Sequence, residues 1–90
     1  MRIDIIKINS SIQKKIYEKH NISAEEVELV LKEGNPIFKR VGGNQIMAIG
    51  LYERYVTIFF TYNPKRKQAT ITTAYQSDRK QVKYCKRIRR

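Results

Sequence analysis

Cysteine and histidine are nearly absent from this 90-residue sequence, which contains one of each, Cys85 and His20. One cysteine cannot form an internal disulfide, and one histidine with scattered carboxylates does not make a zinc ligand set. We therefore expect no metal and no cofactor, and we expect His20 to cap or pack at a helix end. Basic neighbours could activate the Cys85 thiol, but its position three residues after Val82 favours packing in a helix stripe.

Long apolar runs and Gly-rich loops are missing as well. No stretch approaches the length needed to cross a bilayer, and the first eight residues alternate charged and apolar side chains instead of forming a signal sequence. These features favour a cytoplasmic protein without a membrane partner. The Gly42-Gly43 pair is isolated and lies between strand-like segments, which disfavours a nucleotide-binding phosphate loop.

Acidic residues are scarce, with 8 Asp and Glu against 19 Lys and Arg and a net charge of +11. Four acids lie between Glu25 and Glu33, whereas the segment after Asp78 is strongly basic: Arg79, Lys80, Lys83, Lys86, Arg87, Arg89 and Arg90. Such a field attracts polyanions and gives salt-dependent affinity for phosphates. A nucleic-acid partner is favoured, while a solubility role and the docking of an acidic protein remain alternatives.

The pattern of apolar residues predicts a single α+β domain spanning residues 1–90. A hydrophobic content of 41% is sufficient for one core, and the length is too small for two. The order β-α-α-β-β-β-β-α is expected, with strands at 2–8, 37–41, 45–49, 54–62 and 68–74, and helices from 10 to about 20, from 23 to 34, and from 77 onward.

Local signals mark the second helix and the hairpin after it. The Ser23 hydroxyl is expected to accept a bond from the Glu26 amide, and the Glu26 carboxylate to return one to the Ser23 amide, as in a capping box. Gly34 is placed to end this helix before Pro36, and Gly42-Gly43-Asn44 predicts a turn between two strands.

The residues left for chemistry are tyrosine, lysine and arginine. This inventory suits RNA cleavage, because the 2′-hydroxyl of RNA is the nucleophile and the protein need only align it, stabilise charge and move protons. Arginine offers forked donors to phosphate, tyrosine or lysine can transfer protons, and aromatic rings stack on bases. The same side chains also fill sheet faces and solvate surfaces. The candidates are Lys39, Arg40, Tyr52, Arg54, Tyr55, Tyr62, Tyr75, Arg79 and Tyr84.

Several segments resemble one known family in the same order. Residues 19–31, KHNISAEEVELVL, are similar to the KHGVSxEEVEEVF segment of BrnT-like toxins, and Asn35-Pro36 stands where that family often has Asp-Pro. Residues 48–61, AIGLYERYVTIFFT, are similar to the family's ALGxTxxGRYLxVFFT region. The ITTA run at 71–74, followed by a basic helix with Tyr84, resembles its ISAR…ERRxY ending.

The resemblance implies a fold of the RelE superfamily, a curved antiparallel sheet with helices on one side. It also implies the toxin of a type II toxin-antitoxin system, a metal-independent endoribonuclease neutralised by a small antitoxin that is usually encoded beside it. Its substrate would be RNA, either free or as mRNA on a ribosome. Whether the chain forms a homodimer stays open.

The resemblance also implies roles for individual residues. Arg54 would contact the scissile phosphate, Lys39 or Arg40 would stabilise developing charge, and Tyr84 or Tyr75 would orient the nucleotide or assist proton transfer. Further RNA contacts are expected from Arg79, Lys80, Lys83, Lys65, Arg66, Lys67 and Tyr52. The family has Arg at the position of Tyr75 and Gly at that of Glu53, so a non-catalytic RNA- or DNA-binding module of the same fold remains the alternative.

Overall fold

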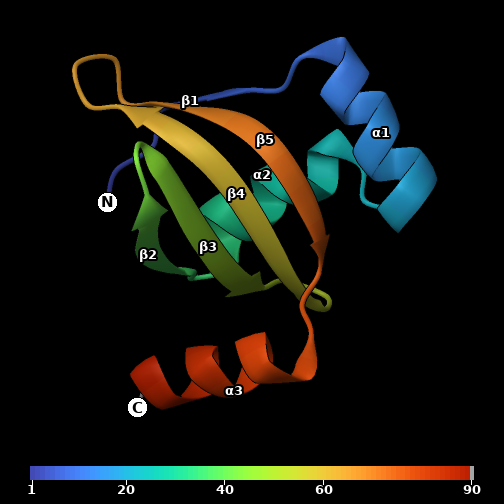
Figure 1. Ribbon diagram of the computed structural model, residues 1–90, viewed down its shortest axis with the longest axis vertical. Helices are drawn as coiled ribbons and strands as arrows, with labels where there is room; N and C mark the ends of the chain where they lie inside the picture. Colours follow the sequence, from blue (N-terminus) through green and yellow to red (C-terminus); the bar gives the residue numbers. More distant parts are fainter. Residues whose placement is uncertain (90) are drawn as a thin grey trace.

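The computed structural model describes residues 1–89, so Arg90 of the basic run lies outside the described residues. The predicted α+β order is confirmed (Figure 1). The elements are β1 (Ile5–Lys7), α1 (Ser10–His20), α2 (Ala24–Glu33), β2 (Ile37–Gly42), β3 (Gln45–Leu51), β4 (Tyr55–Asn63), β5 (Gln68–Gln76) and α3 (Arg79–Ile88).

The five strands form one sheet in the order β1-β5-β4-β3-β2. Strands β2 to β5 are antiparallel neighbours, as expected for strands joined by short turns. β1 differs from the expected antiparallel pattern, because it pairs in parallel with β5 and is only three residues long. It can do so because α1 and the rest of the chain intervene between the two strands, which gives the long connection that parallel pairing requires.

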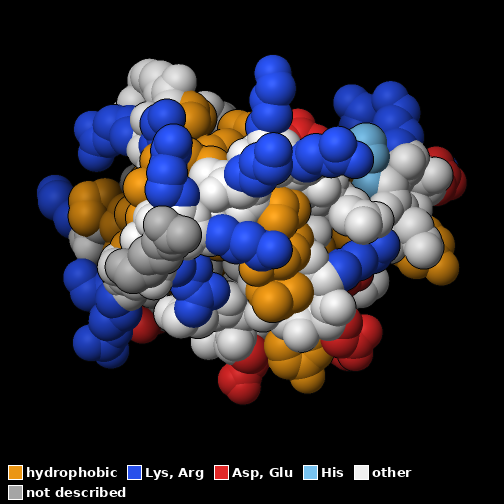
Figure 2. All heavy atoms as spheres, turned by 90° about the horizontal axis from the view of Figure 1, so that it is seen from below, with side chains coloured by type: hydrophobic (Ala, Val, Ile, Leu, Met, Phe, Trp, Pro, Cys, Tyr) orange, Lys and Arg blue, Asp and Glu red, His pale blue; other side chains and the backbone are white. Residues whose placement is uncertain are grey.

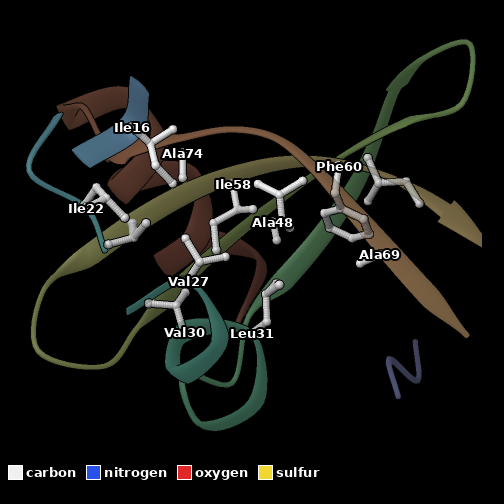
Figure 3. Close-up of a cluster of buried hydrophobic side chains, with 13 residues drawn as sticks. Ile16, Ile22, Val27, Val30, Leu31, Ala48, Ile58, Phe60, Ala69 and Ala74 are labelled. Carbon is white, nitrogen blue, oxygen red and sulfur yellow. The ribbon is translucent and has the colours of Figure 1, made fainter. Parts of the chain in front are cut away.

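Helices α1 and α2 cover one face of the sheet. Alternate residues of a strand point to the same face, and on β4 it is Val56, Ile58 and Phe60 that join the buried cluster with residues of these helices. Figure 3 shows Phe60 and Ile58 pointing into the same cluster as Ile16 of α1 and Val27 of α2. The core therefore occupies the space between the sheet and the first two helices.

Helix α3 packs against the other face of the sheet. Its buried Cys85 approaches the backbone oxygen of Ile49, with Sγ 3.6 Å from that atom. Thr57 of β4 is also fully buried. It lies directly opposite Ile49 of β3, and its hydroxyl donates to Gln81 of α3. In Figure 1 α3 runs beneath the lower end of the sheet, away from α1 and α2. One end of the second face is thus covered, and the remainder is open.

The helix caps follow the sequence signals with one exception. The Ser23 hydroxyl accepts from the Glu26 amide at 3.1 Å, as predicted. The prediction that the Glu26 carboxylate returns a bond to the Ser23 amide was wrong, because that carboxylate binds the guanidinium of Arg54 instead. A charged, forked donor competes successfully with one backbone amide. The full capping box lies at α3, between Asp78 and Gln81.

The turn between β2 and β3 requires glycine. Gly42 and Gly43 have φ values of 137° and 52°, in the region that side chains with a Cβ rarely adopt. The predicted hairpin is therefore confirmed at the predicted residues. Within residues 1–89 no helix has the length and apolar character of a bilayer span.

Cys85 behaves as a core residue, as predicted. It is fully buried, and burial raises the pKa of its thiol, while the neighbouring Arg89 acts in the opposite direction. We expect the native protein to react with Ellman's reagent at pH 8 much more slowly than the guanidinium-unfolded chain, because the thiol is both inaccessible and protonated. The absorbance of the released thiolate measures both rates. Equal rates would contradict this placement of Cys85.

Candidate nucleic-acid interface

Helix α3 contacts four strands on the second face of the sheet. Gln81 contacts Tyr75 of β5 and Thr57 of β4, and Tyr84 contacts Lys39 of β2. Cys85 meets β3 between these two contacts. Because the helix spans the sheet, residues far apart in the sequence share one surface.

The end of this surface over β2 carries two positive charges on one aromatic ring. Lys39 Nζ lies 5.0 Å from the centre of the Tyr84 ring, and the guanidinium carbon of Arg87 lies 5.7 Å from it. Both distances fall within the range of cation–π interactions. Tyr84 thus keeps two cations beside one ring at this end of the surface.

The end over β5 is aromatic. The Tyr75 ring lies 6.1 Å from the ring of Phe59 and 5.8 Å from that of His20, the last residue of α1. The predicted packing of His20 at a helix end is confirmed. The Tyr75 hydroxyl oxygen is 2.9 Å from Gln81 Nε2. We call the whole surface the α3 junction, and define it by Lys39, Phe59, Tyr75, Gln81, Tyr84 and Arg87.

The pairing of residues between strands gives the distance across the junction. Lys39 pairs with Met47, and Met47 pairs with Phe59, so these three residues form one row across β2, β3 and β4. Tyr75 lies on β5, one strand further and two residues away from this row, because it pairs with Thr57. With about 4.8 Å per strand and about 3.4 Å per residue along a strand, Lys39 and Tyr75 are about 16 Å apart, a length that suits two or three nucleotides better than a single phosphate.

Positive charge surrounds the junction. The basic side chains of α3 are exposed, and they comprise Arg79, Lys80, Lys83, Lys86 and Arg87. Figure 2 views the molecule from the α3 side, where Lys and Arg are spread over the face and Asp and Glu lie mostly at its margins. Acidic residues are concentrated on α2, on the other side of the sheet. The expected asymmetry of charge is therefore present.

Arg40 is separated from Lys39, although the two are consecutive. Arg40 pairs with Ile46, which belongs to the core face, and it lines a hollow with Met1, Asn44, Tyr62 and Pro64. The alternation of side chains along a strand puts Lys39 on the α3 face and Arg40 on the other. Of the two residues assigned to charge stabilisation, Lys39 is the one that reaches the junction.

Arg54 is engaged in an ion pair with Glu26 of α2. Its Nε and one terminal nitrogen each lie 2.8 Å from a carboxylate oxygen of Glu26, and the same terminal nitrogen donates to the backbone oxygen of Asn21 at 2.8 Å. The bond to Glu26 raises the pKa of Arg54 further, so it stays charged. The guanidinium joins the β3–β4 connection to the loop between α1 and α2.

The other predicted RNA contacts fall into three places. Arg79, Lys80 and Lys83 lie on α3 beside the junction. The connection from β4 to β5 carries Lys65, Arg66 and Lys67 at the opposite end of the sheet from α3 (Figure 1). Tyr52 lies in a hollow with Glu25, Glu26 and Glu53, whose negative charge opposes a phosphate chain. Among residues 1–89 no group of three or more His, Cys, Asp or Glu is placed to hold a metal ion.

Comparison with solved structures finds the same architecture in a ribonuclease toxin, BrnT of Brucella abortus. The match has a TM-score of 0.68 and covers 84% of this chain and 100% of the BrnT chain. This chain has the BrnT fold. The sequence identity is only 11%, so the likeness is one of fold. No protein-family model matches the sequence, and no curated protein matches it significantly.

Within this BrnT fold, the structure adds residues that sequence reasoning missed. Gln81, Thr57 and Phe59 belong to the junction or support it, and Arg87 had been counted only as charge. Asp78-x-x-Gln81 has the spacing of a capping box, which was a readable signal for Gln81. Nothing in the sequence marked Phe59, because its position on the open face depends on the register of β4.

Proposed function

We propose that this chain binds single-stranded RNA at the α3 junction and cleaves it without a metal ion, as the toxin of a type II toxin-antitoxin pair. The observation that carries the proposal is the gathering of Lys39, Tyr75, Tyr84 and Arg87 on one face by α3. The net charge of +11 and the BrnT fold support it. The proposed partners are RNA and an antitoxin that covers the junction in the cytoplasm.

The proposed reaction uses the RNA's own nucleophile. The 2′-oxygen attacks the adjacent phosphorus, the bond from phosphorus to the 5′-oxygen breaks, and the products carry a 2′,3′-cyclic phosphate and a 5′-hydroxyl. In this proposal Lys39 and Arg87, which both approach the Tyr84 ring, stabilise the added negative charge of the pentavalent phosphate, and the Tyr84 hydroxyl helps to move the proton of the 2′-hydroxyl to the departing 5′-oxygen. Tyr75 and Phe59 hold the neighbouring nucleotide.

The second candidate is a non-catalytic RNA-binding module of the same fold. The observation that favours it is the engagement of Arg54, because both of its carboxylate bonds must break before it can reach a phosphate. Tyr75, where the resembling family has Arg, removes another fixed charge from the site. In this alternative the junction binds RNA by stacking and phosphate contacts alone.

One assay decides between the two candidates. Labelled single-stranded RNA is incubated in chelator with the parent protein, Lys39→Ala, Arg54→Ala and Lys32→Ala, and the products are sized. We expect cleavage by the parent and at least about a hundredfold slower cleavage by Lys39→Ala, as for loss of one transition-state contact. Lys32 is exposed on α2, so Lys32→Ala controls for the loss of one charge and should cleave like the parent.

The result for Arg54→Ala decides whether Arg54 has a role in cleavage or in the fold. A folded Arg54→Ala variant that cleaves like the parent removes Arg54 from the site and leaves it the structural role seen in its pair with Glu26. Loss of cleavage with intact folding supports the role that the resemblance implies. If the parent binds RNA but leaves it uncut, both free and on ribosomes, the binding module is the correct function.

A further inference from the structure

Gln81 is the centre of a hydrogen-bond network at the start of α3. Its side-chain oxygen accepts from the backbone N–H of Asp78 at 3.0 Å and from the Thr57 hydroxyl at 3.0 Å. Its side-chain nitrogen lies 2.9 Å from the Tyr75 hydroxyl oxygen. Because the amide oxygen already serves two donors, the NH₂ group is the one that must face Tyr75.

The donors and acceptors of this network can be assigned in only one order. Thr57 has one hydroxyl proton, which it donates to Gln81, so Ser77, 2.7 Å away, must donate to Thr57. Each donor from Ser77 through Thr57 and Gln81 therefore points toward Tyr75. Thr57 is fully buried, and bonds aligned in this way in a low-dielectric environment strengthen one another.

The direction of the network determines what the Tyr75 hydroxyl can do. An amide NH₂ group donates and cannot accept, so the Tyr75 oxygen accepts from Gln81. The phenolic hydrogen is consequently free to point away from α3. The ring itself is held by Phe59 and His20.

We propose that Gln81 is a positioning residue that holds the Tyr75 hydroxyl as a donor to a phosphodiester oxygen of single-stranded RNA. The proposal rests on the proposed function, and it concerns the nucleotide next to the one bound at Lys39 and Tyr84. A phosphodiester presents only acceptors, and hydrogen bonds to an anionic oxygen are stronger than those to a neutral one. Arg79 and Lys80, in the first turn of α3, add positive potential on the same side.

Gln81→Glu tests the direction of the bond while preserving the shape of the side chain. A glutamate at this position still accepts from Asp78 and Thr57, so the helix cap remains. Its second oxygen accepts where the amide donated, and the Tyr75 hydroxyl turns inward to donate to it. We expect Gln81→Glu to bind a fluorescent 2′-O-methyl oligouridine, which lacks the 2′-hydroxyl nucleophile and stays uncut, about 10- to 100-fold more weakly than the parent, as for the loss of a hydrogen bond to a charged group. Tyr75→Phe should show a similar loss.

Two controls separate this effect from charge and from folding. Gln76→Glu adds the same charge one residue from Tyr75, at an exposed position on the opposite face of β5, and its smaller loss of affinity measures the effect of net charge. The double variant Gln81→Glu with Tyr75→Phe, compared with Tyr75→Phe, measures the effect of the charge at position 81 itself. Adding Gln81→Glu should weaken binding less in Tyr75→Phe than in the parent, because Gln81 acts through the hydroxyl. Circular dichroism at increasing temperature shows whether each variant keeps its fold.

The free protein gives a second readout. The tyrosine Raman doublet, taken as the difference between parent and Tyr75→Phe, should report an accepting hydroxyl in the parent and a donating one in Gln81→Glu. If the parent binds oligouridine and Gln81→Glu binds like Gln76→Glu, the role of Gln81 is overturned while the proposed function stands. If the parent itself does not bind, both proposals fall.

Discussion

Replacing Arg79, Lys80 and Lys83 by glutamine should weaken RNA binding severely and make it much less sensitive to salt. Each phosphate neutralised on a single strand adds about −0.7 to the slope of log affinity against log salt, so four to six contacts predict a roughly 50- to 300-fold loss between 50 and 200 mM salt. Removing three contacts should reduce that slope by about two. Glutamine keeps helix propensity, so α3 should remain folded.

The matched control is the triple replacement of Lys65, Arg66 and Lys67 by glutamine. It removes the same charge from the β4–β5 connection at the far end of the sheet. Fluorescence anisotropy with one uncleavable 2′-O-methyl oligonucleotide, measured over a range of salt for the parent and both triple variants, compares the two ends directly. A larger change in slope for the β4–β5 variant would move the RNA site away from α3 and contradict the proposed junction.

Phe60→Ala should have the largest effect on stability. Phe60 is fully buried on β4 and packs edge-to-face against Phe38, with ring centres 6.2 Å apart. Replacing a buried phenylalanine by alanine costs about 3–5 kcal/mol, a large share of the roughly 5–15 kcal/mol that stabilises a typical domain. For a domain of this size that loss should lower Tm by more than about 10 °C.

Ile88→Ala is the control for Phe60→Ala. Ile88 is 53% exposed at the end of α3, and exposed positions usually change stability by no more than about 0.5 kcal/mol. Urea unfolding followed by circular dichroism gives both free energies. Similar losses for the two variants would mean that Phe60 is not at the centre of the core.

Local signals were sufficient for most of the secondary structure. The Ser23 hydroxyl caps α2, and the Gly42-Gly43 turn joins β2 to β3, because each depends on residues within four positions of one another. The Glu26 carboxylate was misassigned for the same reason. Its partner, Arg54, lies 28 residues away, and no local pattern indicates that contact.

The candidate site shows the same difference between what local sequence signals predict and what long-range contacts decide. Sequence reasoning selected the residue types, and it included Lys39, Tyr75 and Tyr84 among many basic and aromatic candidates. It could not choose between Lys39 and Arg40, because that choice depends on which face of β2 meets α3. The pairing of Lys39 with Met47 and the crossing of α3 over the sheet made the choice.

The sequence by itself determined the order of helices and strands, the strong positive charge and its concentration after Asp78. These properties follow from composition, periodicity and caps, which act over a few residues. Only the tertiary structure decided that Tyr75 and Tyr84 share a surface with Lys39 while Arg54 is held by Glu26. The reason is physical, since strand register and the docking of α3 are set by burial of the whole core, to which every element contributes.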